Sequence, residues 1–334
     1  MRRLGHEVEV RVISPERQWA SDLPGLALKR IHGMAGSALR LMSALWILRD
    51  VERFDLIFMN RDLLPEVHID WIEPWLTSRN QRLIFDFDDA IYLGHRMKKI
   101  RKILPSFAHV TAGNDTLASF SKEVIEPARV SVLPTVVDTD VLVPAINRRP
   151  GPFRIGWMGS RWTMMLHLPI IQTVLERLAG EISMEFHVVC DKKPDFRWKN
   201  VNMHYKPWSA EREREDLQDF DVGLMPLPDS AFERGKCGCK AIQYMASGIP
   251  SLISPVGAAS EIVRHQIDGF HCSSEQDWSQ NLKELAGSPD KRKRLGRSAR
   301  ERAENCYSLH YAVPRLLEIF EQVCQRCNKG FRVA

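Results

Sequence analysis

The sequence predicts an α/β protein made of two doubly wound domains, each a parallel sheet with crossover helices. Short β-branched runs alternate with longer helical stretches along the chain, which is the pattern of such sheets. The 334 residues exceed one ordinary domain and suit two. Residues 143–152 contain three prolines and no apolar periodicity, so they are typical of a linker between the two domains.

The first predicted domain covers residues 1–145. We expect its strands at 7–13, 55–59, 82–86, 109–112 and 130–133, and its helices at 37–51, 66–79 and 114–124. A doubly wound domain ordinarily opens with a strand, a glycine-rich turn and a helix. This chain opens instead with what reads as a helix end, Gly5 and a strand. We therefore expect the first βα unit to be missing, the alternative being a domain that begins with an edge strand.

The second predicted domain covers residues 146–310. Its expected strands are 153–158, 185–190, 201–204, 222–225 and 251–254, and its expected helices are 165–179, 210–220, 240–247, 260–266, 276–286 and 290–306. The last residues, 311–334, are expected to form a terminal helix that can cross back to the first domain.

The composition excludes several classes of protein. Lys and Arg number 47 against 42 Asp and Glu, so the net charge of +5 does not favour a nucleic-acid binder. Seven unevenly spaced cysteines do not form a disulfide framework, which favours a reducing compartment. Cys324 and Cys327 form a lone Cys-x-x-Cys without the partners of a zinc site. No apolar run reaches the roughly 18 residues of a spanning helix, so we expect a cytoplasmic protein.

A basic, glycine-rich loop precedes the predicted helix at 240–247. Helix N-termini offer unpaired N–H groups and a positive dipole end, so this loop suits an anion. Lys236 and Lys240 add charge that suits a diphosphate. A second loop around Gly257 follows the next strand at its carboxyl end, where ligands of open α/β sheets bind. The alternative is that the glycines only form turns and the lysines are only solvated.

Three carboxylates, Asp86, Asp88 and Asp89, stand at the end of a strand of the first domain. This pattern suits a metal or the binding of hydroxyl groups. The alternatives are a helix N-cap for Asp89 and a solvated turn for the others. Arg61 follows another strand and suits an anionic acceptor, an interdomain salt bridge being the alternative.

These stretches resemble the donor site of retaining glycosyltransferases of family 4. The resemblance rests on Gln243-Tyr-Met-Ala-Ser-Gly-Ile-Pro250, Ser254-Pro-Val-Gly257 and the segment 261–270. It extends to Phe153-Arg-Ile-Gly-Trp-Met-Gly-Ser160 and to segments 1–8, 133–140 and 290–303, and so covers nearly the whole chain. It implies the GT-B architecture, two Rossmann-like domains facing across a cleft, and sugar transfer with retention that needs no cofactor and no metal.

The resemblance also implies roles for individual residues. Asp88, Asp89 and Lys240 would be catalytic, and Arg61 and Asp86 would face the acceptor. The donor would be bound by Gly159, Ser160, Arg161, Thr163, Glu233, Lys236, Gln243, Gly257, Ala258, Ala259 and Glu261. Of these, Gln243 would meet the ribose, and Arg161, Lys236 and Lys240 the diphosphate.

Two positions depart from the family pattern. Family members often carry glutamates where this chain has Lys236 and Gln243. An amide can still accept a hydrogen bond from ribose, but without charge. A lysine cannot accept one, so Glu233 or Asp229 would have to replace the missing carboxylate.

The expected function is that of a hexosyltransferase-type glycosyltransferase in surface polysaccharide or glycoconjugate biosynthesis. The donor would be a UDP- or GDP-sugar, and the acceptor a glycan or a lipid-linked sugar. Residues 96–104 place basic and apolar residues at helical spacing, so they suit peripheral contact with the inner face of the plasma membrane; a solvated helix face is the alternative. Two other readings stay open, a GT-B epimerase of UDP-sugars and an inactive nucleotide-sugar-binding pseudo-glycosyltransferase.

Overall fold

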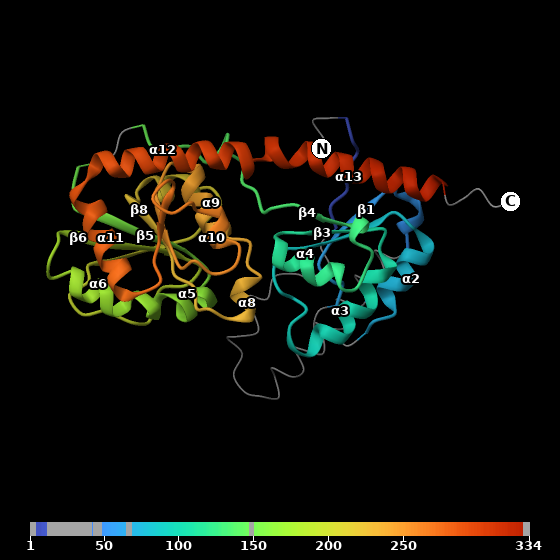
Figure 1. Cartoon of the computed structure of the whole chain (residues 1–334), viewed down its shortest axis with the longest axis horizontal. Coiled ribbons are helices and arrows are strands. Elements are labelled where there is room, and N and C mark those ends of the chain that lie inside the picture. Colours follow the sequence, from blue (N-terminus) through green and yellow to red (C-terminus); the bar gives the residue numbers. More distant parts are fainter. Residues whose placement is uncertain (1–4, 12–41, 43–48, 65–68, 147–149, 330–334) are drawn as a thin grey trace.

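A computed structural model of the chain describes residues 5–11, 42, 49–64, 69–146 and 150–329. Figure 1 shows two α/β units side by side, with a long helical span running along one side of both. Residues 7–11 of the first predicted strand are not in a strand. The rest of that strand, most of the predicted helix at 37–51 and the start of the helix at 66–79 lie outside the described residues.

The first unit is built on a parallel four-stranded sheet with the order β1-β2-β3-β4. Its strands are β1 (Ile57–Asn60), β2 (Leu83–Phe87), β3 (His109–Ala112) and β4 (Val130–Val132). Its described α-helices are α2 (Ile72–Arg79), α3 (Met97–Ile103) and α4 (Asp115–Lys122). Phe85, Phe87 and Phe107 are fully buried in its core. The sheet carries loops that leave the carboxyl ends of its strands toward the second unit.

The second unit is built on a parallel six-stranded sheet with the order β10-β9-β8-β5-β6-β7. Its strands are β5 (Phe153–Gly159), β6 (Met184–Cys190), β7 (Met203–Pro207), β8 (Val222–Met225), β9 (Ser251–Ile253) and β10 (Gly269–His271). Its α-helices up to the terminal span are α5 (Arg161–His167), α6 (Gln172–Leu178), α7 (Glu213–Gln218), α8 (Ala231–Arg234), α9 (Cys239–Ala246), α10 (Ala259–Ile262) and α11 (Glu275–Gly287). The strand order reverses between β5 and β8, and ligands of open α/β sheets bind at such a switch point.

Two glycines at the centre of this sheet position α9. Gly156 and Gly223 are register partners on β5 and β8. A Cβ on Gly156 would overlap the ring of Phe220, and a Cβ on Gly223 would overlap the ring of Tyr244. The Tyr244 hydroxyl accepts a hydrogen bond from the Met158 amide at 3.2 Å and donates one to the Leu224 carbonyl at 3.3 Å. The bare backbone therefore lets α9 lie close to the strand ends of the sheet.

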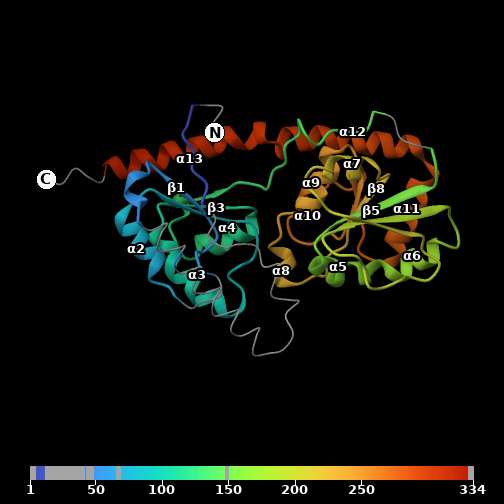
Figure 2. The same ribbon diagram turned by 180° about the vertical axis from the view of Figure 1, so that it is seen from behind.

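The helical span consists of α12 (Pro289–Cys306), which covers the second unit, and α13 (Leu309–Lys329), which covers the first (Figures 1 and 2). Ile319 and Val323 of α13 pack against Ile84 of β2. The rings of Phe320 and Phe58 lie 5.9 Å apart. Among the described helices, none is both long and apolar enough to cross a membrane.

The prediction of two doubly wound α/β domains is confirmed. The differences are local. Strand β10 was missed, β7 lies closer to the C-terminus than predicted, and the helix expected at 165–179 is divided into α5, a 3₁₀ turn (Leu168–Ile171) and α6. Pro169 explains the division, since proline lacks the N–H that a continuous helix needs at that position.

Candidate functional site

The two units meet where the basic loop of the second contacts the end of β3 in the first. Asn114 caps α4 and donates from Nδ2 to the Gly235 carbonyl at 2.9 Å. A Cβ on Gly113 would overlap the sulfur of Cys237, and one on Gly235 would lie 2.6 Å from the Cβ of Ala90. The contact therefore brings the loop predicted to bind an anion directly against the first unit.

The first unit contributes a carboxylate cluster to this junction. Nη2 of Arg61 lies 2.7 Å from Oδ1 of Asp88 and 2.9 Å from Oδ2 of Asp89. Nζ of Lys236 from the second unit lies 3.8 Å from Oδ1 of Asp89. Burial raises the pKa of Asp89, with Lys236 acting in the opposite direction. The interdomain salt bridge considered for Arg61 is thus made by Lys236, whereas Arg61 pairs within its own unit.

Arg61 and Asp86 are held tightly by the backbone and by neighbouring side chains. Arg61 has a φ of 63°, which is uncommon for a residue other than glycine, and its amide donates to the Asp86 carbonyl at 2.8 Å. The Asp86 carboxylate accepts hydrogen bonds from Asn60 at 2.8 Å and from Thr111 at 2.6 Å. Burial raises the pKa of Asp86. Both side chains are therefore held in place by contacts within the first unit.

Lys240 lies in the first turn of α9, beside the end of β5. Gly238 caps the helix in the left-handed conformation with a φ of 64°. A Cβ on Gly159 would lie 2.7 Å from Cε of Lys240, so the lysine stem passes directly beside this glycine. Nζ lies 5.5 Å from the centre of the Trp157 ring. Burial, together with the charge of Lys236, lowers the pKa of Lys240 from 10.5 to about 8.

Glu233 and His167 form a buried pair beside the two lysines. Nε2 of His167 lies 3.5 Å from Oε1 of Glu233, and both side chains are buried. The hydroxyl of Ser230, which caps α8, also contacts the Glu233 carboxylate. Burial and the charge of Lys240 lower the pKa of His167, so its imidazole is neutral at pH 7. Sequence reasoning missed His167, because a lone histidine in a helix carries no signal.

Acidification is expected to destabilise the fold below about pH 6.5, because His109 and His167 are buried in neutral form. Burial lowers the pKa of His109 from 6.5 to about 4, with Arg326 and Arg129 adding to the effect. Below 6.5 the unfolded chain takes up these protons before the native chain does, so stability present above that pH is lost toward pH 4. Thermal unfolding across this range measures the loss.

The matched comparison is His109→Gln against His310→Gln, since His310 is exposed beside Asp140. Glutamine can keep a hydrogen bond to Ser131, which lies 2.9 Å from the His109 ring. We expect a shallower pH slope for His109→Gln and an unchanged slope for His310→Gln. Identical slopes in both variants would contradict the prediction.

Gln243 has a carboxylate partner that the sequence did not indicate. Its Nε2 donates to Oε1 of Glu213 at 2.7 Å, and Nε1 of Trp208 donates to Oε2 of the same carboxylate at 3.2 Å. Glu213 precedes Gln243 by 30 residues, so no local spacing connects them. The side chain of Gln243 is therefore part of a three-residue group that includes a negative charge.

The remaining predicted donor residues lie on loops at the strand ends. Ser160 caps α5 by accepting from the Thr163 amide. Arg161 forms an ion pair with Asp195 at 2.7 Å, so its charge already has a carboxylate partner. Gly257 has a φ of 54° and lies against the Arg234 backbone. The other predicted residues of this loop lie at the start of α10: Ala258 precedes the helix, and Ala259 and Glu261 are in its first turn.

Three basic side chains of α3 form ion pairs with carboxylates of the first unit. Lys99 is only 3% exposed, lies 2.8 Å from Asp62 and donates to the Leu64 carbonyl at 2.8 Å. Arg101 pairs with Glu123 at 2.6 Å and Lys102 with Asp70 at 2.9 Å. The helical spacing of basic residues therefore reflects ion pairs within the unit as well as solvated side chains.

Comparisons with known proteins show which fold and which family this chain is similar to. Residues 153–288 match the family described as glycosyl transferases group 1. No curated protein sequence matches the chain. The structure is similar to that of a glycosyltransferase from Rickettsia africae, with a TM-score of 0.66 and 17% identity over 84% of this chain and 80% of that one.

Two further solved structures are similar. Sucrose-phosphate synthase from Thermosynechococcus elongatus has a TM-score of 0.62 and 14% identity, over 81% of this chain and 74% of that one. Anabaena HepE in complex with UDP-glucose has a TM-score of 0.61 and 12% identity, over 86% and 82%. The chain therefore has the GT-B fold, and most of its second unit is similar to the family described as glycosyl transferases group 1. The family match and the shared fold together support a glycosyltransferase.

Proposed function

We propose that the protein transfers a hexose with retention from a UDP- or GDP-sugar to a glycan or lipid-linked acceptor, in the manner of family 4, and that it serves surface polysaccharide or glycoconjugate biosynthesis. The observation that carries the proposal is the junction of the two units. There Lys236 of the second unit lies 3.8 Å from Asp89 of the first unit, with Asp88 next to it in sequence, and Lys240 follows Lys236 in the first turn of α9. Cations that suit a diphosphate thus adjoin carboxylates that suit sugar hydroxyls.

The chemistry follows from this arrangement. The bond between the anomeric carbon and the diphosphate oxygen breaks, while the acceptor oxygen forms its bond on the same face of the sugar. The acceptor proton passes to the leaving diphosphate, so no carboxylate nucleophile is needed. Developing charge on that diphosphate is the main electrostatic demand, and preorganised cations and N–H groups meet it best. Lys236, Lys240 and the amides at the start of α9 take this role, and we propose that no metal is required.

The ribose fits the group formed by Gln243, Glu213 and Trp208. A carboxylate accepts hydrogen bonds from ribose hydroxyls more strongly than an amide does. Glu213 lies within 2.7 Å of Gln243 and so supplies the charge that the glutamine lacks. This pairing makes the replacement of a family glutamate by Gln243 compatible with donor binding.

In this proposal the buried pair of Glu233 and His167 lies beside the sugar end of the donor site. Glu233 is the carboxylate that replaces the one absent at Lys236, and its contact with Ser230 fixes its orientation. Asp229 is less suited, because it forms an ion pair with Arg234 at 2.6 Å on the surface. Arg161 would have to break its ion pair with Asp195 before it could bind a phosphate.

The test is calorimetric titration with a panel of UDP- and GDP-sugars, followed by assays of donor hydrolysis and of transfer. Binding of one donor with slow hydrolysis and faster transfer to an added acceptor supports the proposal. Conversion of the free donor into an epimer without any acceptor identifies the epimerase instead. Binding with no turnover of any kind identifies an inactive binding protein. Failure of every nucleotide sugar to bind refutes the donor site itself.

We also propose a cytoplasmic location with peripheral contact to the inner face of the plasma membrane, which a lipid-linked acceptor would require. Exposed apolar residues on α5 support such a contact: Trp162, Met165 and Leu166 are all exposed at helical spacing. Sedimentation with anionic vesicles tests this part separately from donor binding.

A further inference from the structure

Three potential metal ligands gather at the edge of the second sheet, away from the donor site. Glu185 and His187 are two residues apart on β6 and therefore point to the same face of the sheet. His204 lies on the edge strand β7 as the register partner of His187. Glu185 and His204 lie near the amino ends of their strands and His187 lies in the middle of β6, whereas the proposed donor site lies at the carboxyl ends.

The ligand atoms lie near the spacing of a tetrahedral metal site. Nε2 of His187 lies 3.1 Å from Oε2 of Glu185, and Nε2 of His204 lies 3.7 Å from Oε1 of the same carboxylate. One ligand atom from each residue lies within 4.8 Å of the other two. Ligands at zinc-ligand distances in a tetrahedron stand about 3.3 Å apart. Small side-chain rotations are therefore enough to place all three around one ion.

His187 is the buried member of the three. It is only 7% exposed, and its Nδ1 has no hydrogen-bond partner among the described residues.

Two cationic side chains lie near the cluster, and one of them is paired with carboxylates outside it. Nε of Arg154 lies 3.8 Å from Glu185 and competes for it. Lys206, two residues after His204, pairs with Asp216 at 3.0 Å and with Asp219 at 2.7 Å. The carboxylate of Glu185 thus faces two imidazoles and one guanidinium, and a divalent ion would have to displace the guanidinium and replace the hydrogen bond between His187 and Glu185.

We propose that Glu185, His187 and His204 bind a divalent transition-metal ion of the zinc type. Two imidazoles and one carboxylate form a donor set that Zn²⁺ accepts, with a remaining position for water. The ion would join the edge strand β7 to β6 and so hold the border of the sheet. This site is independent of the proposed sugar transfer.

The first experiment titrates the full chain with Zn²⁺ in competition with a chromogenic chelator. His204→Ala is the informative variant, because His204 is 44% exposed and its loss leaves the core intact. We expect the wild type to bind one equivalent more tightly than His204→Ala, by more than about 100-fold, since even outer-shell losses cost 10- to 100-fold. Glu185→Gln, which keeps the shape of the side chain, is expected to behave like His204→Ala.

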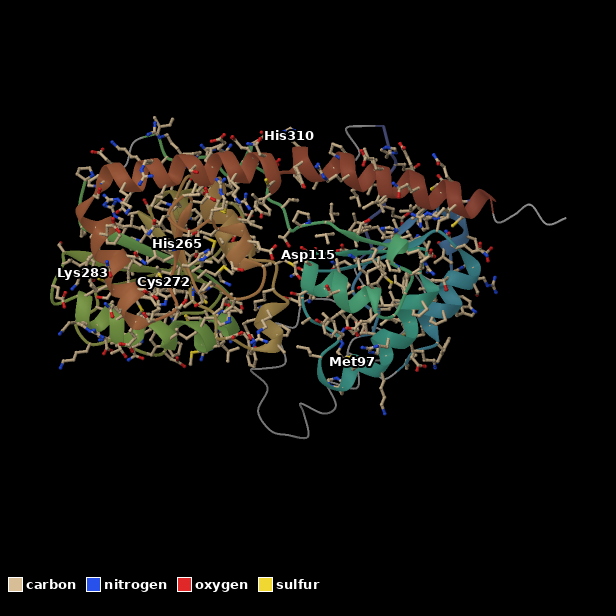
Figure 3. All side chains as sticks on the ribbon, viewed as in Figure 1. Met97, Asp115, His265, Cys272, Lys283 and His310 are labelled. Atoms are coloured by element: carbon tan, nitrogen blue, oxygen red, sulfur yellow. The ribbon has the colours of Figure 1, made fainter. Side chains whose placement is uncertain are left out.

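The matched control is His310→Ala. His310 stands at the start of α13 beside Asp140, at 3.1 Å, and offers a two-residue pair instead of three ligands (Figure 3). Its removal is expected to change neither the number of bound ions nor their affinity. Zn²⁺ should also raise the Tm of the wild type and of His310→Ala, but not that of His204→Ala.

Free cysteines are the competing ligands, and Co²⁺ distinguishes them. All seven cysteines are free thiols, and Cys239 is exposed. A nitrogen and oxygen site gives visible Co²⁺ bands without the thiolate charge-transfer band in the near ultraviolet. We expect His204→Ala to lose those visible bands. Equal binding by the wild type, His204→Ala and Glu185→Gln, or a Co²⁺ spectrum due to thiolates alone, would overturn the proposal.

Discussion

Replacing Lys240 with methionine is expected to lower kcat/KM for sugar transfer by about 10²- to 10³-fold, the range found when one preorganised transition-state donor is removed. Methionine keeps an unbranched stem beside Gly159 and Trp157 but removes the positive charge. The decrease in kcat/KM therefore measures the effect of the positive charge and not that of side-chain packing. Steady-state kinetics with the donor identified by titration measures it, and circular dichroism checks the fold.

The matched control is Lys283→Met, because Lys283 is a surface lysine of α11 that pairs with Glu181 (Figure 3). Its activity should stay within a factor of about two of the wild type, as surface pairs contribute little. Equal losses in both variants would mean that Lys240 has no special electrostatic role.

The same lysine gives donor binding a pH dependence. The pKa of Lys240 is lowered to about 8, so the side chain is charged at pH 7 and loses its proton as the pH rises through 8. A bound diphosphate favours the charged form and raises this pKa again. The donor Kd of the wild type should therefore increase up to tenfold for each pH unit above 8, whereas that of Lys240→Met should not follow this trend.

The second large effect is expected for Gly257→Ala. Gly257 has a φ of 54°, and a Cβ there would overlap the carbonyl oxygen of Arg234, a backbone atom that cannot rotate away. The left-handed conformation costs an alanine about 1–2 kcal/mol, and overpacking adds about 1–3 kcal/mol. We expect the free energy of unfolding to fall by about 2–5 kcal/mol in urea, with a loss of activity because the loop before Lys236 must move.

Gly94→Ala separates these two costs. Gly94 also has a positive φ, of 69°, but a Cβ there would meet nothing within 4 Å. It should lose only the conformational part, about 1–2 kcal/mol, and retain activity. If both variants lost the same stability, the contact with Arg234 would have no energetic consequence.

Local patterns predicted most of the fold. Strands β3 and β8 have the bounds predicted from their β-branched and apolar runs, and α12 differs from its predicted range by one residue. Strand β10 was missed because its three residues, Gly269–His271, contain a glycine and no β-branched residue, so they lack the composition typical of a strand. Its place in the sheet comes from pairing with β9, which is a long-range property.

The candidate site was predictable only where one stretch of chain supplies it. The basic loop with Lys236 and Lys240 is continuous in sequence, and so is the group of Asp86, Asp88 and Asp89. Glu213 and His167 reach the site from distant elements, and a single glutamate or histidine has no distinguishing context. For Lys99 the sequence pattern predicted a solvated side chain, as is usual for a lysine at helical spacing. The structure instead buries Lys99 between Asp62 and Glu73.

The crossing of the chain between α12 and α13 has a mechanical consequence. The Val137 amide donates to the Tyr307 carbonyl at 3.0 Å, and the Leu309 amide donates to the Val137 carbonyl at 3.3 Å, so both interdomain connections touch at one place. Since α12 packs on one unit and α13 on the other, a change in the angle between the units has to be absorbed at this pivot. Rotation about this pivot would lengthen or shorten the Lys236–Asp89 distance. The part of the candidate site on each unit would stay intact.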